Sequence, residues 1–221
     1  MIKFHDRRDA GQQLAAKLAA YKQRTDAIVL GIPRGGIVVA DEIARALHAP
    51  LDVFITRKIG APFNHELALG AVASDGTLFL DQELVHQLHI PQRLVERARE
   101  KQLREIQRRV EMYRRDKPPL ALENKIVILV DDGIATGATT FAALRALKTK
   151  NPARVILAVP IAPRQVVPLL RGECDEVVLL DTPEPFVAVG YFYRDFAQVT
   201  DKQVVEILEG AQKMAEVKSG E

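Results

Sequence analysis

Short runs of apolar residues alternate along the chain with segments in which apolar residues recur every three or four positions. The wholly apolar runs are typical of strands buried on both faces, and the three- or four-residue spacing is typical of helices. The predicted strands cover 26–32, 51–56, 125–130, 154–162 and 173–182. The predicted helices cover 6–20, 37–47, 140–149, 163–170 and a segment that begins near Thr200 and Asp201. Strand and helix alternate, which predicts an α/β fold with a mostly parallel sheet flanked by helices.

The alternation is interrupted after residue 56. The segment 57–64, RKIGAPFN, contains a glycine, a proline and two adjacent cations, so we expect a mobile loop there. Two strand-like segments follow at 67–74 and 77–81, and the Asp75-Gly76 pair between them predicts a tight turn. The next residues, 82–122, look like a helical insertion into the alternating pattern.

A long charged helix is predicted over 91–117, inside this insertion. It contains ten Lys or Arg residues against five Asp or Glu residues, a net charge of +5. Leu103, Ile106, Val110 and Tyr113 are spaced three, four and three residues apart and form one apolar stripe. We interpret the segment as a solvated helix that lies on the domain through this stripe. The alternatives are a partner surface or dimer arm, and a basic stripe for nucleic acid.

Composition narrows the class of protein. With 221 residues, 48% of them hydrophobic, the chain is long enough for one domain over 1–221 with a sizeable core. Its net charge of +2 is too small to imply a nucleic-acid partner, and its apolar runs are shorter than the ~20 residues that cross a membrane. The N-terminal segment has no apolar stretch of the signal-peptide type, and Cys174 is the only cysteine. We therefore expect a cytoplasmic protein without an internal disulfide.

The candidate chemistry is concentrated after the predicted strand at 125–130. Asp131 and Asp132 follow this strand directly, and a loop of small residues, 133–139, leads into the next helix. Carboxylates accept hydrogen bonds from sugar hydroxyls, and the N–H groups of such a loop and of a helix N-terminus hold phosphate. The carboxyl ends of parallel strands meet at one edge of a sheet, so the loops 32–36 and 57–66 should lie nearby. The arrangement predicts a binding site for a sugar phosphate.

The same stretch carries a resemblance to a known family. The chain lacks both the G-x-x-x-x-G-K-[ST] loop of P-loop proteins and the G-x-G-x-x-G loop of dinucleotide-binding folds. The segment V-I-L-V-D-D-G-I-A-T-G-A-T instead resembles the diphosphate-sugar signature of the type I phosphoribosyltransferases: an apolar strand, two acids, four variable residues and T-G-x-T. The resemblance covers roughly 26–195. It implies the fold of that family, with the helical insertion at 82–122 and a small hood at 181–200.

The resemblance implies how a phosphoribosyl group binds. Asp131 and Asp132 would accept hydrogen bonds from the ribose 2′- and 3′-hydroxyls. N–H and hydroxyl groups of the following loop would hold the 5′-phosphate, and its substrate-binding residues are Gly133, Ala135, Thr136, Gly137, Ala138 and Thr139.

The resemblance also implies a pocket for the leaving group. The family's pyrophosphate loop, which often contains a non-proline cis peptide bond, corresponds here to Pro33, Arg34, Gly35 and Gly36. The cis bond would join Pro33 to Arg34, and Arg34 would add a charge-assisted hydrogen bond. Arg57 and Lys58 lie where the family has a flexible loop that closes over the reaction centre. Glu66 in that loop is either a base or a surface residue. The predicted catalytic residues are Arg34, Lys58, Asp131 and Asp132.

The tail resembles the hood of the purine-type members. There Phe186 would stack on the base and the backbone of Val187 would contact the edge of the base; alternatively, Phe186 and Tyr191 belong to the core. One residue departs from the hypoxanthine/guanine pattern, because Ala135 stands where those members have an aspartate proposed to act on the base. Adenine- and orotate-type members also lack that acid. The two hints disagree about the base.

The implied activity is transfer of the 5-phosphoribosyl group between phosphoribosyl diphosphate and a nitrogenous base, purine-like by the hint from the tail, with Mg²⁺ and pyrophosphate. Substrate oxygens and water would hold Mg²⁺, with no protein metal ligand assigned. The alternative is a non-catalytic sensor or regulator that binds phosphoribosyl diphosphate or a nucleotide. A synthetase of the same fold would need a longer acidic signature and two domains. Members of this fold are commonly dimers, so we expect a homodimer.

Overall fold

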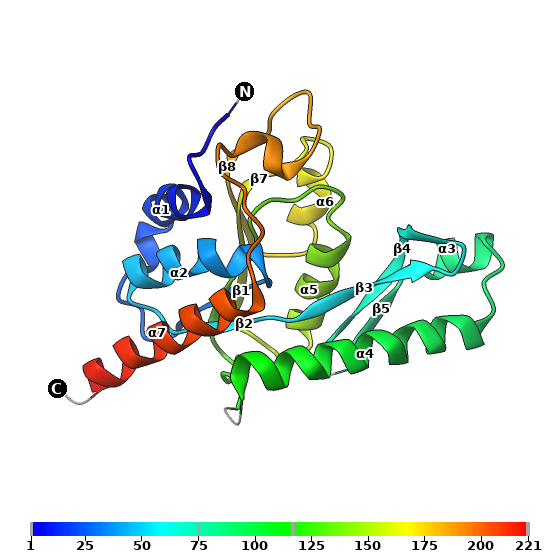
Figure 1. Ribbon diagram of the computed structural model, residues 1–221, viewed down its shortest axis with the longest axis horizontal. Helices are drawn as coiled ribbons and strands as arrows, with labels where there is room; N and C mark the ends of the chain where they lie inside the picture. The colour runs from blue at the N-terminus through cyan, green and yellow to red at the C-terminus, as the bar shows by residue number, and fades with distance from the viewer. Residues whose placement is uncertain (1, 75, 116–117, 220–221) are drawn as a thin grey trace.

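A five-stranded parallel sheet forms the centre of the protein (Figure 1), which confirms the predicted α/β fold. The computed structural model describes residues 2–74, 76–115 and 118–219. The strands lie in the order β2-β1-β6-β7-β8, and every neighbouring pair is parallel. Their bounds are β1 Ala27–Gly31, β2 Leu51–Val53, β6 Ile126–Val130, β7 Arg154–Ile161 and β8 Glu176–Asp181.

Helices cover both faces of this sheet (Figure 1). Successive side chains of a strand point to opposite faces, so a strand covered on both sides must be apolar throughout. In β6, Ile126, Ile128 and Val130 pack in the core beneath α1, α2 and α7, whereas Val127 and Leu129 pack beneath α5 and α6. The helix bounds are α1 Arg7–Lys17, η1 Ala19–Tyr21, α2 Gly35–Leu47, α5 Ala138–Lys148, α6 Val167–Arg171 and α7 Asp201–Ser219.

Side-chain caps fix the start of three helices. Oδ1 of Asp6 accepts a hydrogen bond from the N–H of Asp9 at 2.9 Å and begins α1. Asp81 caps a short helix, α3 Gln82–Gln87, in the same way. The Thr200 hydroxyl accepts from the N–H of Gln203 ahead of α7. No helix in the described part of the chain is long and apolar enough to span a membrane.

The prediction of a mobile loop at 57–64 is wrong, because these residues belong to an antiparallel sheet of three strands. Gly60 lies at a register shift between the first two strands, and Pro62 and Phe63 form the turn between them. The glycine and proline that suggest a loop therefore mark a bulge and a hairpin turn. Asp75, in the predicted turn before the third strand, lies outside the described residues. The strand bounds are β3 Thr56–Ala61, β4 Asn64–Ala73 and β5 Leu78–Leu80.

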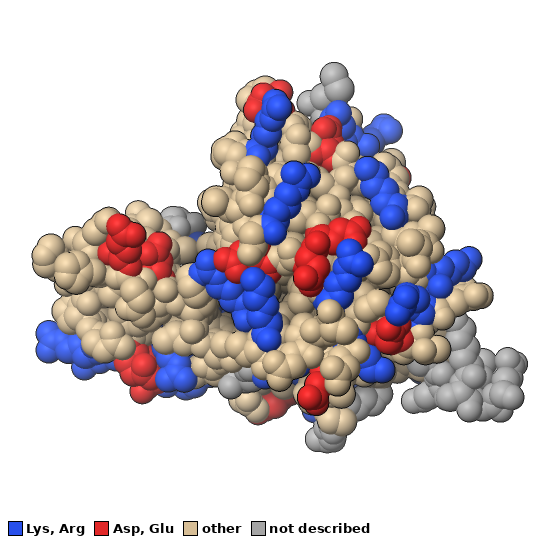
Figure 2. Space-filling view, turned by 180° about the vertical axis from the view of Figure 1, so that it is seen from behind, with Lys and Arg blue, Asp and Glu red and all other residues tan. Residues whose placement is uncertain are grey.

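The long helix α4, Gln92–Arg114, lies against this hairpin in an arm beside the parallel sheet (Figure 1). Its inner face is the predicted apolar stripe, since Ile106 and Tyr113 are buried and Leu103 and Val110 are half-buried. The Tyr113 hydroxyl donates a hydrogen bond to Asp201 at the start of α7. On the face seen in Figure 2, both cationic and acidic side chains lie on this arm. Residues 116 and 117, expected in the helix, lie outside the described chain.

Candidate functional site

The site is built where the strand order of the parallel sheet reverses. β1 and β6 are neighbours, and the chain continues from β1 toward one edge and from β6 toward the other. The loops after such strands diverge and leave a crevice at their carboxyl ends, where ligands bind in open α/β sheets. Here these are the loop 32–36 and the loop 131–137 that precedes α5. The two loops predicted to carry the chemistry are therefore adjacent.

The loop after β1 touches the acidic residues after β6. A Cβ atom on Gly36 would lie 2.7 Å from the Val130 carbonyl oxygen and 2.9 Å from Asp131 Cα. A Cβ atom on Gly35 would lie 1.8 Å from Asp132 Oδ2. Only glycine allows this approach, which explains the Gly-Gly pair. The Pro33–Arg34 peptide bond is cis, as the resemblance predicts.

The acidic pair is held by residues from distant parts of the chain. Arg7 Nε of α1 donates to Asp132 Oδ2 at 2.6 Å, and the two side chains are only 11% and 16% exposed. The Tyr193 hydroxyl donates to the Asp132 carbonyl oxygen at 2.6 Å. The N–H of Asp132 donates to Asp131 Oδ1 at 2.9 Å. Both carboxyl groups therefore have defined orientations.

Burial and mutual repulsion make this pair hard to ionise. Burial raises the pKa of Asp131 well above its usual value, and the neighbouring Asp132 charge raises it further. Burial also raises the pKa of Asp132, while the Arg7 guanidinium opposes that rise. Burial and the adjacent carboxylates raise the pKa of Tyr193, which keeps its hydroxyl as a neutral donor. Arg7 therefore forms an ion pair with one member of a buried pair of acids that repel each other when both are charged.

The loop after the pair forms an open start to α5. Gly133 and Gly137 have positive φ angles of 150° and 81°, which glycine adopts without strain. Gly137 is the N-cap residue and provides no side-chain cap, so the first N–H groups of α5 are available to an anion. Ala135 and Thr136 are exposed at the surface. Thr139, in the first turn of this 11-residue helix, is half-buried.

Arg57 and Lys58 lie on strand β3 instead of in a mobile loop. The strand begins next to the first turn of α5, where Thr56 Oγ1 donates to the Thr139 carbonyl oxygen at 3.5 Å. Arg57 Nε donates to Gln102 Oε1 of α4 at 3.0 Å. Burial lowers the pKa of Arg57, and nearby Arg109 lowers it further. Arg57 of the hairpin and Arg109 of α4 are therefore close enough to repel each other. The side chain of Glu66 lies outside the described residues.

The tail 181–200 forms a cover beside the acidic pair. Its short helix η2, Val189–Phe192, brings Val189 against the loop, where a Cβ atom on Gly133 would lie 2.5 Å from Val189 Cγ1. The N–H of Phe4 donates to the Phe192 carbonyl oxygen at 3.0 Å, which fixes the tail to the N-terminal segment. Phe186 is half-buried and its ring centroid lies 5.3 Å from that of Phe192. Val187 is 65% exposed.

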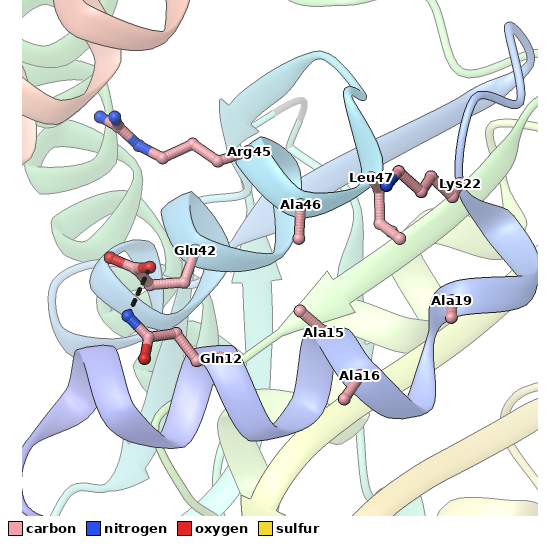
Figure 3. A pocket seen from close by; sticks show the side chains of 9 residues that line it. All are labelled: Gln12, Ala15, Ala16, Ala19, Lys22, Glu42, Arg45, Ala46 and Leu47. Atoms are coloured by element: carbon pink, nitrogen blue, oxygen red, sulfur yellow. Dashed lines mark hydrogen bonds between the residues drawn. The ribbon is translucent and has the colours of Figure 1, made fainter.

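Two cavities lie elsewhere and include none of the predicted site residues. One, of about 480 Å³, lies between α1, η1 and α2, where Gln12 Nε2 donates to Glu42 Oε2 at 3.2 Å (Figure 3). The other, of about 610 Å³, lies between α2, β2, α7 and the end of α4. The candidate site lies outside both cavities, at the carboxyl ends of β1 and β6.

Comparison with known sequences decides the family. The sequence model of the phosphoribosyl transferase domain matches residues 4–194. The chain belongs to the phosphoribosyl transferase domain family. The match extends from the N-terminal segment through Tyr193, so it includes the acidic pair and most of the tail that covers it.

Relatives of this phosphoribosyl transferase domain include a protein of Mycobacterium tuberculosis H37Rv named "Putative phosphoribosyl transferase Rv0571c". It is 46% identical over 210 residues, which cover 95% of this chain and 47% of the relative. The chain therefore spans about half the length of this curated relative. TT1426 of Thermus thermophilus has a similar structure, with 45% identity, 94% and 98% of the two chains covered, and a TM-score of 0.82. AQ2163 of Aquifex aeolicus shares the fold at 14% identity, covering 83% and 78%, with a TM-score of 0.50.

Reasoning from the sequence did not identify three residues that lie at the acidic pair or support it: Arg7, Tyr193 and Phe196. Arg7 Cζ lies 3.7 Å from the ring centroid of Phe196, and its Nη1 donates to the Ala197 carbonyl oxygen at 2.9 Å. These residues lie outside the signature, in the first turn of α1 and in the tail. Two sequence features could have drawn attention to them: Arg7 follows the Asp6 cap, and aromatic residues are frequent at 191–196. Neither feature indicates which residue is contacted in the fold.

Proposed function

We propose that this domain transfers the 5-phosphoribosyl group between phosphoribosyl diphosphate and a nitrogenous base, with pyrophosphate as the other product or substrate. One observation carries the proposal: Gly35 and Gly36 of the loop after β1 contact the acidic pair after β6. A ribose bound to the acids would therefore have its C1 substituent beside the loop 33–36. Family membership supports the same reaction class.

The ribose is assigned to Asp131 and Asp132. Their carboxylates accept hydrogen bonds from the 2′- and 3′-hydroxyls, which fixes the ring in the crevice. Positive charge develops on the ribose as the bond from C1 to the pyrophosphate oxygen breaks. Burial disfavours the charged form of both acids, but an acid of the pair that is ionised in the substrate complex stabilises this charge more strongly than solvent does. Pyrophosphate leaves with the bonding electrons, a ring nitrogen of the base bonds to C1, and the base loses its N–H proton.

The phosphates are assigned to the two glycine-containing loops. The 5′-phosphate would be held by N–H and hydroxyl groups of Thr136, Gly137, Ala138 and Thr139 at the start of α5. The pyrophosphate would bind the loop 33–36, where Arg34 contributes a charge-assisted hydrogen bond. Arg57 and Lys58 would stabilise the leaving charge from β3.

Mg²⁺ fits this site as a partner of the substrate. Among the described residues there is no cluster of three or more His, Cys, Asp or Glu side chains that could hold a metal ion. One of the two carboxylates in the crevice is already bound by Arg7. Mg²⁺ commonly retains waters and binds substrate phosphates, so phosphoribosyl diphosphate oxygens and water would hold it. When bound, it neutralises charge on the departing pyrophosphate.

The base is assigned to the space beneath the tail 181–200. Val187 is exposed, and its backbone would contact the edge of a base. Phe186 packs against Phe192 and would present one face to the base. Ala135 is exposed in the phosphate loop and has no titratable group. The residue that exchanges the proton of the base is therefore not Ala135, and a purine-like base stays a prediction.

The test is pyrophosphate release from phosphoribosyl diphosphate and Mg²⁺ with a panel of purine and pyrimidine bases. We expect release with one class of base, and loss of release in the double variant Asp131→Asn, Asp132→Asn. Asp26→Asn is the matched control, since this exposed acid precedes β1 at the other end of the strands. Binding of phosphoribosyl diphosphate without release with any base would support the alternative, a sensor or regulator, and contradict the enzyme.

A further inference from the structure

We propose that Arg7 is a positioning residue for the ribose site: it holds the Asp132 carboxylate in one orientation. Arg7 donates to Asp132 Oδ2, so a ribose hydroxyl would donate to Oδ1. The inference rests on the proposed function, because it presumes that a ribose binds at the acidic pair.

Three contacts fix the Arg7 guanidinium. Nε donates to Asp132 Oδ2 at 2.6 Å, and Nη1 donates to the Ala197 carbonyl oxygen at 2.9 Å. The ring of Phe196 lies under the guanidinium, 3.7 Å from Cζ to the ring centroid. The Arg7 side chain is only 11% exposed. A surface arginine seldom has this combination of a charged partner, a carbonyl acceptor and an aromatic face, so its geometry points to a defined task.

The helix that carries Arg7 is itself held in place. Arg7 is the first residue of α1, directly after the Asp6 cap. Gly11, one turn later, packs so closely on α2 that a Cβ atom there would lie 2.8 Å from both Glu42 Cβ and the Val39 carbonyl oxygen. The two helices are therefore closely packed at Gly11, which limits movement of α1 toward α2. Arg7 reaches the acidic pair from a rigid support.

The Asp132 carboxylate is enclosed on the side of Arg7. A Cβ atom on Gly35 would lie 1.8 Å from Asp132 Oδ2 and 2.8 Å from Arg7 Nε. The backbone of the predicted pyrophosphate loop therefore packs on the ion pair itself. Any rotation of the carboxylate that breaks the Arg7 contact also disturbs this packing. Arg7 consequently couples the ribose acids to the loop 33–36.

Arg7 is the cation among the titratable groups that face Asp132 in the described residues. The titratable groups that face it are Arg7 from α1, Asp131 from its own loop and Tyr193 from the tail. Asp131 is a like charge, and the Tyr193 hydroxyl bonds the Asp132 carbonyl oxygen instead of its carboxylate. Arg7 lowers the pKa of Asp132, against the effect of burial. Without Arg7, this carboxylate would take up a proton at higher pH.

The experiment compares Arg7→Gln, Arg7→Lys and the control Arg8→Gln. Arg8 is the next residue of α1, is 52% exposed and pairs with Glu42, away from the acidic pair. Binding of phosphoribosyl diphosphate with Mg²⁺ is measured by calorimetry from acidic to neutral pH. In the ligand-free proteins, carbon NMR of the carboxyl groups gives the pKa of Asp132, with Asp132→Asn assigning its signal. Thermal unfolding establishes that each variant is folded.

We expect Arg7→Gln to weaken binding about tenfold, the scale of a lost hydrogen bond to a charged group. The loss should be larger at acidic pH, and the pKa of Asp132 should rise. Arg7→Lys keeps the positive charge, so its binding should depend on pH nearly as that of the wild type does. Arg8→Gln should match the wild type. Equal binding by Arg7→Gln and Arg8→Gln, an unchanged Asp132 pKa, or equal loss in Arg7→Gln and Arg7→Lys at all pH values would overturn the inference. Failure of the wild type to bind would instead overturn the proposed function.

Discussion

Replacement of Gly35 by alanine should damage the site more than its single added carbon suggests. The new Cβ would lie 1.8 Å from Asp132 Oδ2, 2.5 Å from Asp132 Cγ and 2.8 Å from Arg7 Nε. Ordinary contact begins at 3.4 Å, so Oδ2 and Cβ must separate by a further 1.6 Å. The carboxylate cannot move that far and keep its 2.6 Å hydrogen bond from Arg7.

The magnitude follows from these two effects. Overpacking costs about 1–3 kcal/mol, and loss of a hydrogen bond between charged groups costs about 1.5–3 kcal/mol. We therefore expect Gly35→Ala to lower the free energy of unfolding by about 3 kcal/mol. For a chain of this length, that corresponds to a fall of about 6–12 °C in Tm. Binding of phosphoribosyl diphosphate should weaken as well, since the acids are displaced.

Gly210→Ala is the matched control for this experiment. Gly210 lies within α7, and the nearest atom to an added Cβ is Arg45 Nη2 at 4.0 Å. An alanine there fits and should stabilise the helix by about 0.5–1 kcal/mol. Urea unfolding and calorimetric binding of both variants form the assay. Unchanged stability and binding in Gly35→Ala would refute the close packing of the loop 33–36 on Asp132.

Two further predictions concern ion pairs of the helix α4. Asp52→Ala should lower the free energy of unfolding in urea by about 3 kcal/mol, because Arg114 loses its partner at 3.0 Å where both side chains are 11% exposed; a loss below 1 kcal/mol would contradict this. Arg108 and Arg109 lower the pKa of Glu105 from 4.5 to about 2, so Glu105 stabilises the fold above pH 4.5 and loses that contribution as pH falls toward 2. Acid titration of Glu105→Gln should therefore show a shallower loss of stability in that window, and an unchanged slope would count against the pairing.

The parallel sheet was predictable because its signal is local. Five apolar runs, separated by helical spacing, leave one way to bury both faces of each strand. The adjacency of the loops 32–36 and 131–137 was predictable by the same reasoning, since both loops follow parallel strands of one sheet. The Pro33–Arg34 cis bond came from the family resemblance alone, because no local pattern in the sequence indicates it.

The hairpin and the supports of the acidic pair could not be predicted in the same way. Gly60 and Pro62 are compatible with a loop or with a bulged hairpin, and only the cover provided by α4 decides between them. Arg7 and Asp132 are 125 positions apart, so their contact depends on the tertiary fold. The roles of the site residues, the homodimer, the cytoplasmic location and the boundaries 82–122 and 181–200 stay predictions.

We propose that phosphoribosyl diphosphate binds at the carboxyl ends of β1 and β6 through Asp131 and Asp132. Calorimetric titration of the Mg²⁺ complex of phosphoribosyl diphosphate into the wild type and into the double variant Asp131→Asn, Asp132→Asn tests it directly. We expect saturable binding of one ligand per chain to the wild type and to Asp26→Asn, and none to the folded double variant. Equal binding to the wild type and the double variant, or no binding to the wild type, would contradict it.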